Sequence, residues 1–400
     1  MQRRTFLSML STLALSPVAL GAAAHAPPHA LDTIEPLLER LPDSMRPWLS
    51  SDAHRVEIIL ERRDALSNAW HTARHGQRWA RTWTPAASVA KLPMALLMAE
   101  RLQVAGVDAS AVLMLDAAPA TGEWADDEAI ASTFGRDLAR TFAVSDNAPY
   151  NRWYDLLGGD AIHARLSPMG YPHVRLVSRL GSTDVDANRR TGSGRVLAAD
   201  GSMVDVVAPR IAQARRFPFG AAPLGTAWRD DEGRLVPGPH DMRFANFLPL
   251  ADSLRMLRAF VRPASVPAHQ RWRIGDALRA QLLNALALRP ADSVDPTYTA
   301  PEFNDGYARF LMHGHDGARA WPGGVSVFGK SGQAYGDLSE VAHVVEPSTR
   351  VEFLLAARVH ANADGVVNDD RYEYDTVARP LLSAIGDAVL AMERERMRAA

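Results

Sequence analysis

The chain has 400 residues, 47% of them hydrophobic, so it is long enough to bury a large core in one elaborated domain or in two. Its 44 basic and 46 acidic residues nearly balance, and they give no sign of the basic surface that marks nucleic-acid-binding proteins. The absence of cysteine excludes disulfides, thiolate metal sites, a cysteine nucleophile and a lipid-modified N-terminal cysteine.

The first 26 residues have the pattern of an export signal. Arg3 and Arg4 precede an apolar stretch from Phe6 to about Ala24, and a small-x-small cleavage site ends at Ala26. The paired arginines resemble the twin-arginine signal, which exports folded proteins. The sequence therefore predicts a periplasmic or secreted protein. Removing two arginines leaves 42 basic and 46 acidic residues, a net charge of −4.

The alternative for this segment is an uncleaved membrane anchor. Pro17 and Gly21 weaken that helix, and no later stretch is long and apolar enough to cross a bilayer. We therefore expect no stable membrane anchor.

The elements expected next follow hydrophobic periodicity along the chain. A short amphipathic helix is predicted near 34–41, a strand at 56–60 and a strongly apolar helix at about 87–102. Further helices are predicted at 147–157, 250–261 and 274–288. Three successive strands at 325–328, 340–345 and 351–359 then precede a final helix at about 376–394.

This order places strands at both ends of the chain and helices in the middle. It predicts an α+β fold in which both ends build one antiparallel sheet, flanked by helices, with a mostly helical domain inserted. The sheet domain is expected to comprise residues 27–90 and 305–400, and the helical domain residues 91–304. Residues 189–243 are rich in Gly, Pro and Arg and predict a long loop insertion, a feature that is usually functional or mobile.

Only two of the 44 basic residues are lysines, Lys91 and Lys330, so the other 42 are arginines. A lysine can lose its proton when it is buried, whereas an arginine cannot. Lys91 ends the motif Ser88-Val89-Ala90-Lys91 at the start of the apolar helix, where residues three apart share a face. Lys91 can therefore reach the Ser88 hydroxyl and act as its base, and the helix N-terminus favours the developing alkoxide.

Two further motifs follow in the chain. Ser145-Asp146-Asn147 stands just before a predicted helix, where plain helix capping is the alternative interpretation. Lys330-Ser331-Gly332 is expected to follow the strand at 325–328. Both lysines of the chain thus lie in motifs.

Together, S-x-x-K, S-D-N and K-S-G resemble the motif set of the class A serine β-lactamases and the related penicillin-binding proteins, in which the third motif usually carries Thr. Ser331 keeps the hydroxyl at that position. The resemblance covers most of residues 54–185 and 244–395, and the segment between them has no counterpart. It implies a β-lactamase/transpeptidase-like fold.

The resemblance also implies the catalytic roles. Ser88 would attack an amide or lactam carbonyl, and Lys91 would accept its proton. Ser145 would relay a proton to the leaving nitrogen.

It implies substrate-binding roles as well. Lys330 and Ser331, followed by Gly332, would bind the substrate carboxylate. Asn147 would contact the acyl side-chain amide. The oxyanion would lie between the backbone N–H groups of Ser88 and Gln333.

The departure from the family concerns deacylation. Class A enzymes use a carboxylate in E-x-x-L-N, some 35 residues past S-D-N, to activate the hydrolytic water. Here no glutamate lies between Ser145 and Asp230, and the best match is Asp184 in the run from Asp184 to Asn188. Asp184 is a candidate deacylation base, and a solvated acidic turn is an equal alternative.

The leading prediction is a class A β-lactamase-like hydrolase. The alternatives are a D-alanyl-D-alanine carboxypeptidase or related cell-wall peptidase, and a non-catalytic binding protein of this fold. The substrate would be a β-lactam or a peptidoglycan peptide. We expect a monomer without cofactor, metal or nucleic acid, and we interpret His313 and His315 as ordinary loop histidines.

Overall fold

The computed structural model describes residues 30–64, 67–76, 81–119, 121–122, 130–313 and 320–399. The predicted export signal at 1–26 and His315 lie outside these ranges. None of the helices in the described ranges is long and apolar enough to cross a membrane.

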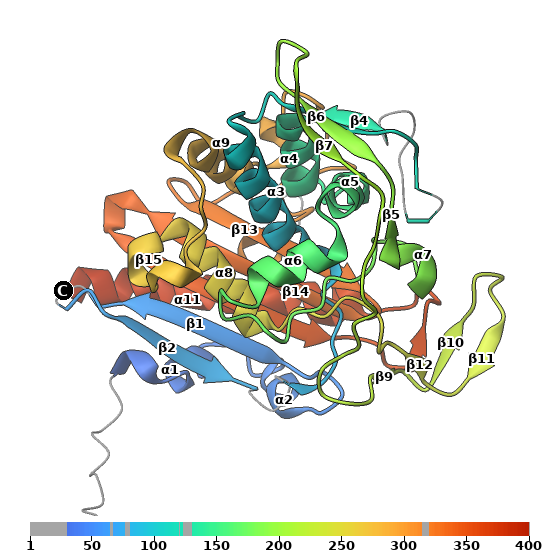
Figure 1. Cartoon of the computed structure of the whole chain (residues 1–400). Coiled ribbons are helices and arrows are strands. Elements are labelled where there is room, and N and C mark those ends of the chain that lie inside the picture. The colour runs from blue at the N-terminus through green and yellow to red at the C-terminus, as the bar shows by residue number, and fades with distance from the viewer. Residues whose placement is uncertain are drawn as a thin grey trace, which may run out of the picture.

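A five-stranded antiparallel sheet joins the two ends of the chain, as the sequence predicts (Figure 1). Its strand order is β13-β14-β15-β1-β2. The two N-terminal strands therefore pair onto the edge of the C-terminal meander, with Leu60 opposite Leu355. The strands are β1 (Glu57–Arg63), β2 (Trp70–His75), β13 (Ser326–Ala334), β14 (Asp337–Glu346) and β15 (Val351–His360).

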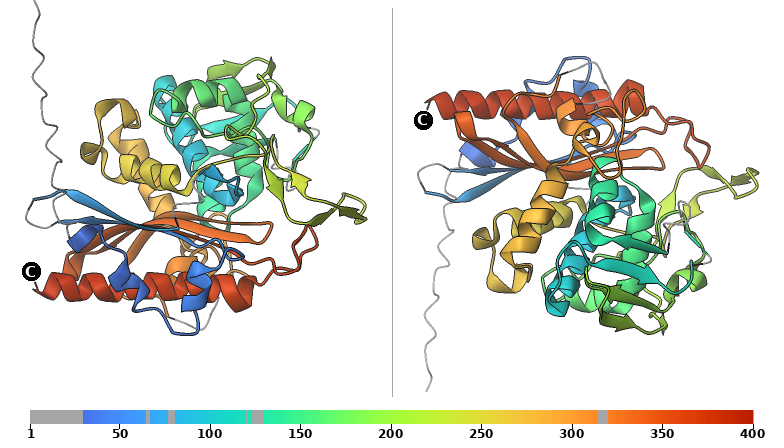
Figure 2. Two further views of the ribbon diagram at one scale, coloured as in Figure 1. Left: turned by 90° about the horizontal axis from the view of Figure 1, so that it is seen from below. Right: turned by 90° about the horizontal axis from the view of Figure 1, so that it is seen from above.

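Helices cover both faces of this sheet, so its central strands are apolar on both sides (Figure 2). Successive side chains of a strand point to opposite faces. Leu355 and Leu60 accordingly pack with the C-terminal helix, whereas Leu354 and Ile59 pack with the middle of the chain. The helices on the C-terminal side are α1 (Glu35–Leu38), α2 (Arg46–Ser50), α10 (Phe310–His313) and α11 (Arg379–Ala399).

The middle of the chain forms the helical part around α3. This helix is buried on nearly all sides, which explains its uniformly apolar sequence, and it ends at Gly106 in the left-handed conformation. The helices here are α3 (Lys91–Ala105), α4 (Phe134–Ala143), α5 (Asn147–Leu157), α6 (Gly159–Leu166), α7 (Val185–Arg189), α8 (Leu250–Val261) and α9 (Asp276–Ala287).

Short strands complete the structure, and many of them lie in the segment 189–243 that the sequence predicted as a loop. A four-stranded sheet has the order β4-β3-β6-β7, and the other short strands form two- and three-stranded pairings. The strands are β3 (Val112–Leu115), β4 (Ala131–Thr133), β5 (Arg190–Thr191), β6 (Gly194–Leu197), β7 (Met203–Val207), β8 (Arg210–Ile211), β9 (Pro223–Leu224), β10 (Ala227–Arg229), β11 (Leu235–Pro237), β12 (His240–Asp241) and β16 (Val366–Val367).

The predicted fold class is confirmed, with two differences in detail. The K-S-G motif lies inside β13 and does not follow a strand, because β13 continues to Ala334. Strand β2 was not predicted, since its sequence, Trp70–His75, is mostly polar and carries little alternation.

Gly386 allows α11 to pack directly against the backbone of α10. A β-carbon there would lie 1.5 Å from the Leu311 carbonyl oxygen of α10. We expect Gly386→Ala to lower the free energy of unfolding by about 3 kcal/mol, because backbone cannot move aside as a side chain can. Gly323→Ala is the matched control, since a β-carbon there meets nothing within 4 Å. Denaturant unfolding measures both, and equal stabilities would contradict this packing.

Candidate active site

Ser88 and Lys91 meet at the start of the central helix. A 3₁₀ turn, Ala87–Ala90, carries Ser88 and runs directly into α3, whose first residue is Lys91. The Lys91 Nζ donates a hydrogen bond of 2.8 Å to the Ser88 Oγ. Ala87 adopts a positive φ of 44°, a conformation that is uncommon for alanine and is often found at functional sites. Ser88 itself lines a cleft.

Ser145 lies between the two lysines. Its Oγ accepts a hydrogen bond of 3.2 Å from the Lys91 Nζ and one of 2.9 Å from the Lys330 Nζ. Lys91 also donates to the Ser145 carbonyl oxygen, and Lys330 donates to the Ser331 carbonyl oxygen at 2.8 Å. Ser145 has a φ of 63°, which is uncommon for serine, and both its carbonyl oxygen and its Oγ accept from Lys91. The structure thus brings Ser88, Lys91, Ser145 and Lys330 into one hydrogen-bonded chain.

Both lysines are fully buried, and more basic than acidic groups surround Lys330. Burial, the neighbouring Lys91 and the buried Arg309 hold the pKa of Lys330 well below its usual range, and Glu340 opposes that shift. The pKa of Glu340 is itself raised by its burial. Lys330 is thus influenced by two other basic groups and by one carboxylate. Because an arginine cannot release its proton, this environment favours the neutral form of Lys330.

Arg309 and Glu340, whose charges act on Lys330, were missed by the sequence analysis. Arg309 donates to the Leu286 carbonyl at 2.8 Å, and the Glu340 carboxylate accepts from the Leu311 N–H at 2.8 Å. Glu340 is paired across the sheet with Ser331, the neighbour of Lys330. Its position in a continuously buried strand was the only available signal.

Gly332 allows β13 to approach the nucleophile closely. A β-carbon at Gly332 would lie 3.1 Å from the Ser88 backbone nitrogen and 3.1 Å from the Ala87 Cβ. Gln333, the next residue, lines the cleft, and its side chain accepts a hydrogen bond of 2.8 Å from Arg379. The close approach at Gly332 places the backbone of Gln333 near the N–H of Ser88, and these are the two groups predicted to hold the oxyanion.

The S-D-N motif combines capping with a place in the site. The Asp146 carboxylate accepts from the Ala148 N–H at 2.9 Å and from the Arg140 Nε at 2.8 Å, so it caps α5. Asn147 lines the cleft. The capping interpretation therefore holds for Asp146, while Ser145 and Asn147 face the site.

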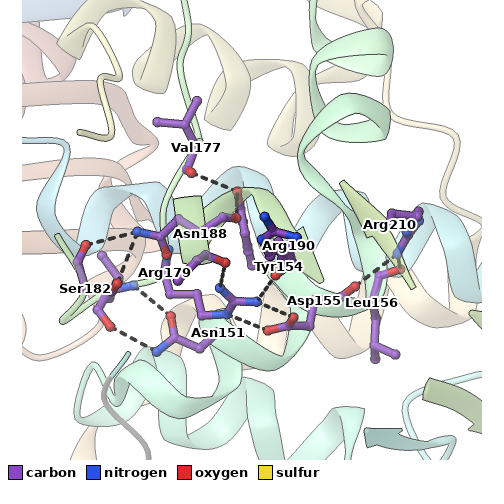
Figure 3. Close-up of polar contacts among 12 residues, drawn as sticks. Asn151, Tyr154, Asp155, Leu156, Val177, Arg179, Ser182, Asn188, Arg190 and Arg210 are labelled. Carbon is purple, nitrogen blue, oxygen red and sulfur yellow. Dashed lines mark hydrogen bonds and ion pairs between the residues drawn. The ribbon is translucent and has the colours of Figure 1, made fainter. Parts of the chain in front are cut away.

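Helix α5 also holds the loop that forms one side of the cleft (Figure 3). Asn151 donates to the Leu180 carbonyl at 3.0 Å and accepts from the Leu180 N–H at 2.7 Å. Arg179 forms a bidentate ion pair with the buried Asp155, at 2.8 and 2.6 Å. The loop is thus fixed to the helix that begins beside Ser145.

Asn188 closes the same loop on itself. Its side-chain oxygen accepts from the Arg179 N–H at 3.0 Å, and its amide donates to the Ser182 Oγ at 3.1 Å. Its carbonyl accepts from the Tyr154 hydroxyl at 3.0 Å (Figure 3). Asn188 therefore has a structural role, which the sequence analysis did not assign.

Asp184 is not brought to the other site residues. Its side chain is exposed and accepts from the Ala187 N–H at 2.9 Å, so it caps α7. Thr183 and Val185 line the cleft, whereas Asp184 does not. Its geometry corresponds to the solvated turn that was the alternative interpretation.

The cleft has a volume of about 660 Å³, within the range of ligand pockets. Among the described residues two carboxylates line it, Asp241 and Asp370, and both lie outside the 178–188 loop. Lys91, Ser145, Lys330 and Ser331 are not among the lining residues, and Ser88, Asn147 and Gln333 are the predicted site residues that line the cleft. In the described ranges no group of three or more His, Asp or Glu side chains is arranged to hold a metal.

Comparisons with known proteins agree with the motifs. Residues 73–204 match the family described as "Beta-lactamase enzyme family", which confirms the predicted resemblance over the segment that carries Ser88, Lys91 and Ser145. A search of curated proteins found no match.

Solved structures described as β-lactamases are similar over most of the chain. The protein from Xanthomonas campestris is 16% identical, with 90% of this chain and 98% of that chain covered and a TM-score of 0.49. The protein from Sphaerobacter thermophilus is 12% identical, with 90% and 97% covered and a TM-score of 0.48. The protein from Burkholderia phymatum is 16% identical, with 89% and 99% covered and a TM-score of 0.47.

Gly332→Ala tests the close approach of β13 to Ser88. The added β-carbon would press on the Ser88 and Val89 backbone nitrogens, both 3.1 Å away, and displace the nucleophile. We expect labelling of Ser88 by a fluorophosphonate probe to slow about tenfold or more. Thermal unfolding, measured in parallel, separates this effect from loss of the fold. Labelling at the native rate would mean that the contact does not position the nucleophile.

Proposed function

We propose that the protein is a serine hydrolase that forms an acyl-enzyme at Ser88 on a β-lactam amide. The observation that supports this proposal is the hydrogen-bonded chain from Ser88 through Lys91 and Ser145 to Lys330. A serine becomes nucleophilic when an adjacent base takes its proton, and a buried neutral lysine supplies that base.

The proposed acylation conserves protons. The Ser88 Oγ attacks the carbonyl carbon, and its proton passes to the Lys91 Nζ, 2.8 Å away. The tetrahedral intermediate collapses when the Ser145 hydroxyl gives its proton to the leaving nitrogen. Ser145 then regains a proton from Lys91 or Lys330, whose Nζ atoms lie 3.2 and 2.9 Å from its Oγ. The ring-opened ligand remains attached to Ser88 as an ester.

Hydrolysis of that ester needs a base for water, and here a second function competes. The carboxylates in the cleft lining, Asp241 and Asp370, belong to the 189–243 insertion and to the 361–374 segment. The 178–188 loop adds none to the described lining. The second candidate is a D-alanyl-D-alanine carboxypeptidase, which shares the acylation residues and also hydrolyses an ester of Ser88.

We also propose that the protein acts in the periplasm or outside the cell. The pattern at residues 1–26 supports this location, and β-lactams and peptidoglycan peptides are substrates of that compartment.

Ser88→Ala tests the proposal directly. We expect it to abolish both turnover and covalent labelling by benzylpenicillin, because the Ser88 hydroxyl is paired with Lys91 and Ser88 lines the cleft, whereas Ser145 does not. Intact-mass spectrometry after timed exposure measures the adduct. Ser348→Ala, at an exposed site, is the control and keeps the adduct. An undiminished adduct on Ser88→Ala would remove Ser88 as the nucleophile.

Asp184→Asn tests the base predicted from sequence. Asparagine preserves the helix cap, so the variant removes only the charge. Because the carboxylate is exposed and capping, we expect the lifetime of the acyl-enzyme to change less than twofold, roughly the effect of a surface charge. Asp186→Asn is the matched control, since Asp186 is exposed on the same helix. A long-lived adduct seen only with Asp184→Asn would restore Asp184 as the base.

A further inference from the structure

The 189–243 insertion is attached to the C-terminal part of the chain beside the cleft. Strand β10 pairs in parallel with β16, placing Trp228 opposite Val367. The Thr226 N–H donates to the Gly365 carbonyl at 2.8 Å. Figure 1 shows the β10–β11 hairpin projecting from the molecule next to the loop that carries β16. Two segments more than 130 residues apart in sequence therefore form one surface.

A small hydrophobic cluster makes this attachment rigid. Leu224 and Met242 of the insertion pack with Val367, which is fully buried, and with Trp83, five residues before Ser88. Gly225 fits tightly here, because a β-carbon would lie 2.6 Å from the Gly365 carbonyl oxygen. The cluster thus connects the insertion both to β16 and to the segment leading to the nucleophile.

One face of this assembly lines the cleft. The residues concerned, which we call the outer wall, come from the insertion and from the 361–374 segment: His240, Asp241, Met242, Asn368, Asp370, Tyr372 and Tyr374. The outer wall lines the cleft together with Ser88 and Asn147, which lie at the starts of the helical segments Ala87–Ala90 and α5.

The outer wall presents hydroxyl donors. The Tyr372 hydroxyl accepts the Asn368 N–H at 2.9 Å, and the Tyr374 hydroxyl accepts the Gly336 N–H at 2.9 Å. Among the described residues neither hydroxyl donates to an acceptor, so its own proton is left for a ligand. Burial raises the pKa of Tyr372 to about 12, which keeps this group a neutral donor at physiological pH. Such donors match carbonyl oxygens.

We propose that the outer wall is a subsite for the acyl side of the substrate, selecting an elongated chain with amide carbonyls that accept from Tyr372. The inference rests on the proposed acylation of Ser88 and adds to it the class of acyl donor. The volume of about 660 Å³ gives room for such a chain beyond the reacting bond. The insertion is then a specificity element of the enzyme.

Two probes separate the subsite from the chemistry. The first is 6-aminopenicillanic acid, which carries the reacting ring and no acyl chain, and the second is a penicillin acylated by a dipeptide amide. The second-order rate constant for Ser88 labelling is measured by intact mass for each probe. We expect the long-chain probe to react at least about fivefold faster with the unmodified protein, the size of one good hydrogen bond.

Tyr372→Phe removes the hydroxyl, and we expect it to lower the ratio of the two rate constants about fivefold. Asn368→Gly is a second variant, since it removes a lining side chain at a φ of 61° that glycine tolerates. It should lower the ratio in the same direction. Tyr307→Phe is the control, because Tyr307 is exposed and does not line the cleft, and it should leave the ratio unchanged.

The outcomes separate the two proposals. If neither probe labels Ser88, the proposed function is wrong. If both probes label the unmodified protein at one rate, or if Tyr372→Phe and Asn368→Gly leave the ratio unchanged, the subsite is wrong and the acylation stands.

Discussion

The Ser145 hydroxyl, held between the Nζ atoms of two buried lysines, is the interaction around which the rest of the site is arranged. Burying two lysines beside Arg309 costs several kcal/mol per charge unless partners offset it. Several groups offset this cost. The Ser88 hydroxyl and the Ser145 carbonyl accept hydrogen bonds from Lys91, and the Glu340 carboxylate acts electrostatically on Lys330. The sheet supplies Lys330, and the helical part supplies Lys91, so the site exists only when both parts pack together.

Helix α5 connects the hydrogen bonds at Ser145 to the loop that lines the cleft. Its N-terminus is capped by Asp146 next to Ser145, and its buried face holds the 178–188 loop through Asn151 and Asp155. A shift of this helix would move the proton relay and the cleft wall together. The buried ion pair of Arg179 with Asp155 adds directional constraint here more than net stability, because desolvation consumes much of its Coulomb energy.

Sequence predicted the parts of the site whose geometry is local. Ser88 and Lys91 are one helical turn apart, and the rarity of lysine identified Lys330 without any structural knowledge. The sheet followed from strongly apolar strands at both ends. Long-range placement could not be predicted in the same way. Strands of two or three residues in the insertion carry no periodicity, and the spacing around Asp184 cannot reveal that its carboxylate turns to cap α7. The loop anchors Arg179 and Asn188 were missed for the same reason, since their partners lie on another helix.

The burial of both lysines has a consequence for the chemistry of the protein as a whole. Apart from its α-amino group, the chain has only two primary amines, and each is fully enclosed. The surface therefore presents no lysine amine to aldehydes, isocyanates or acetyl donors, since its basic side chains there are arginines, whose guanidinium groups do not react as amines do. Both lysine amines are thus kept inside the candidate site, where Ser88 is a nucleophilic group that lines the cleft.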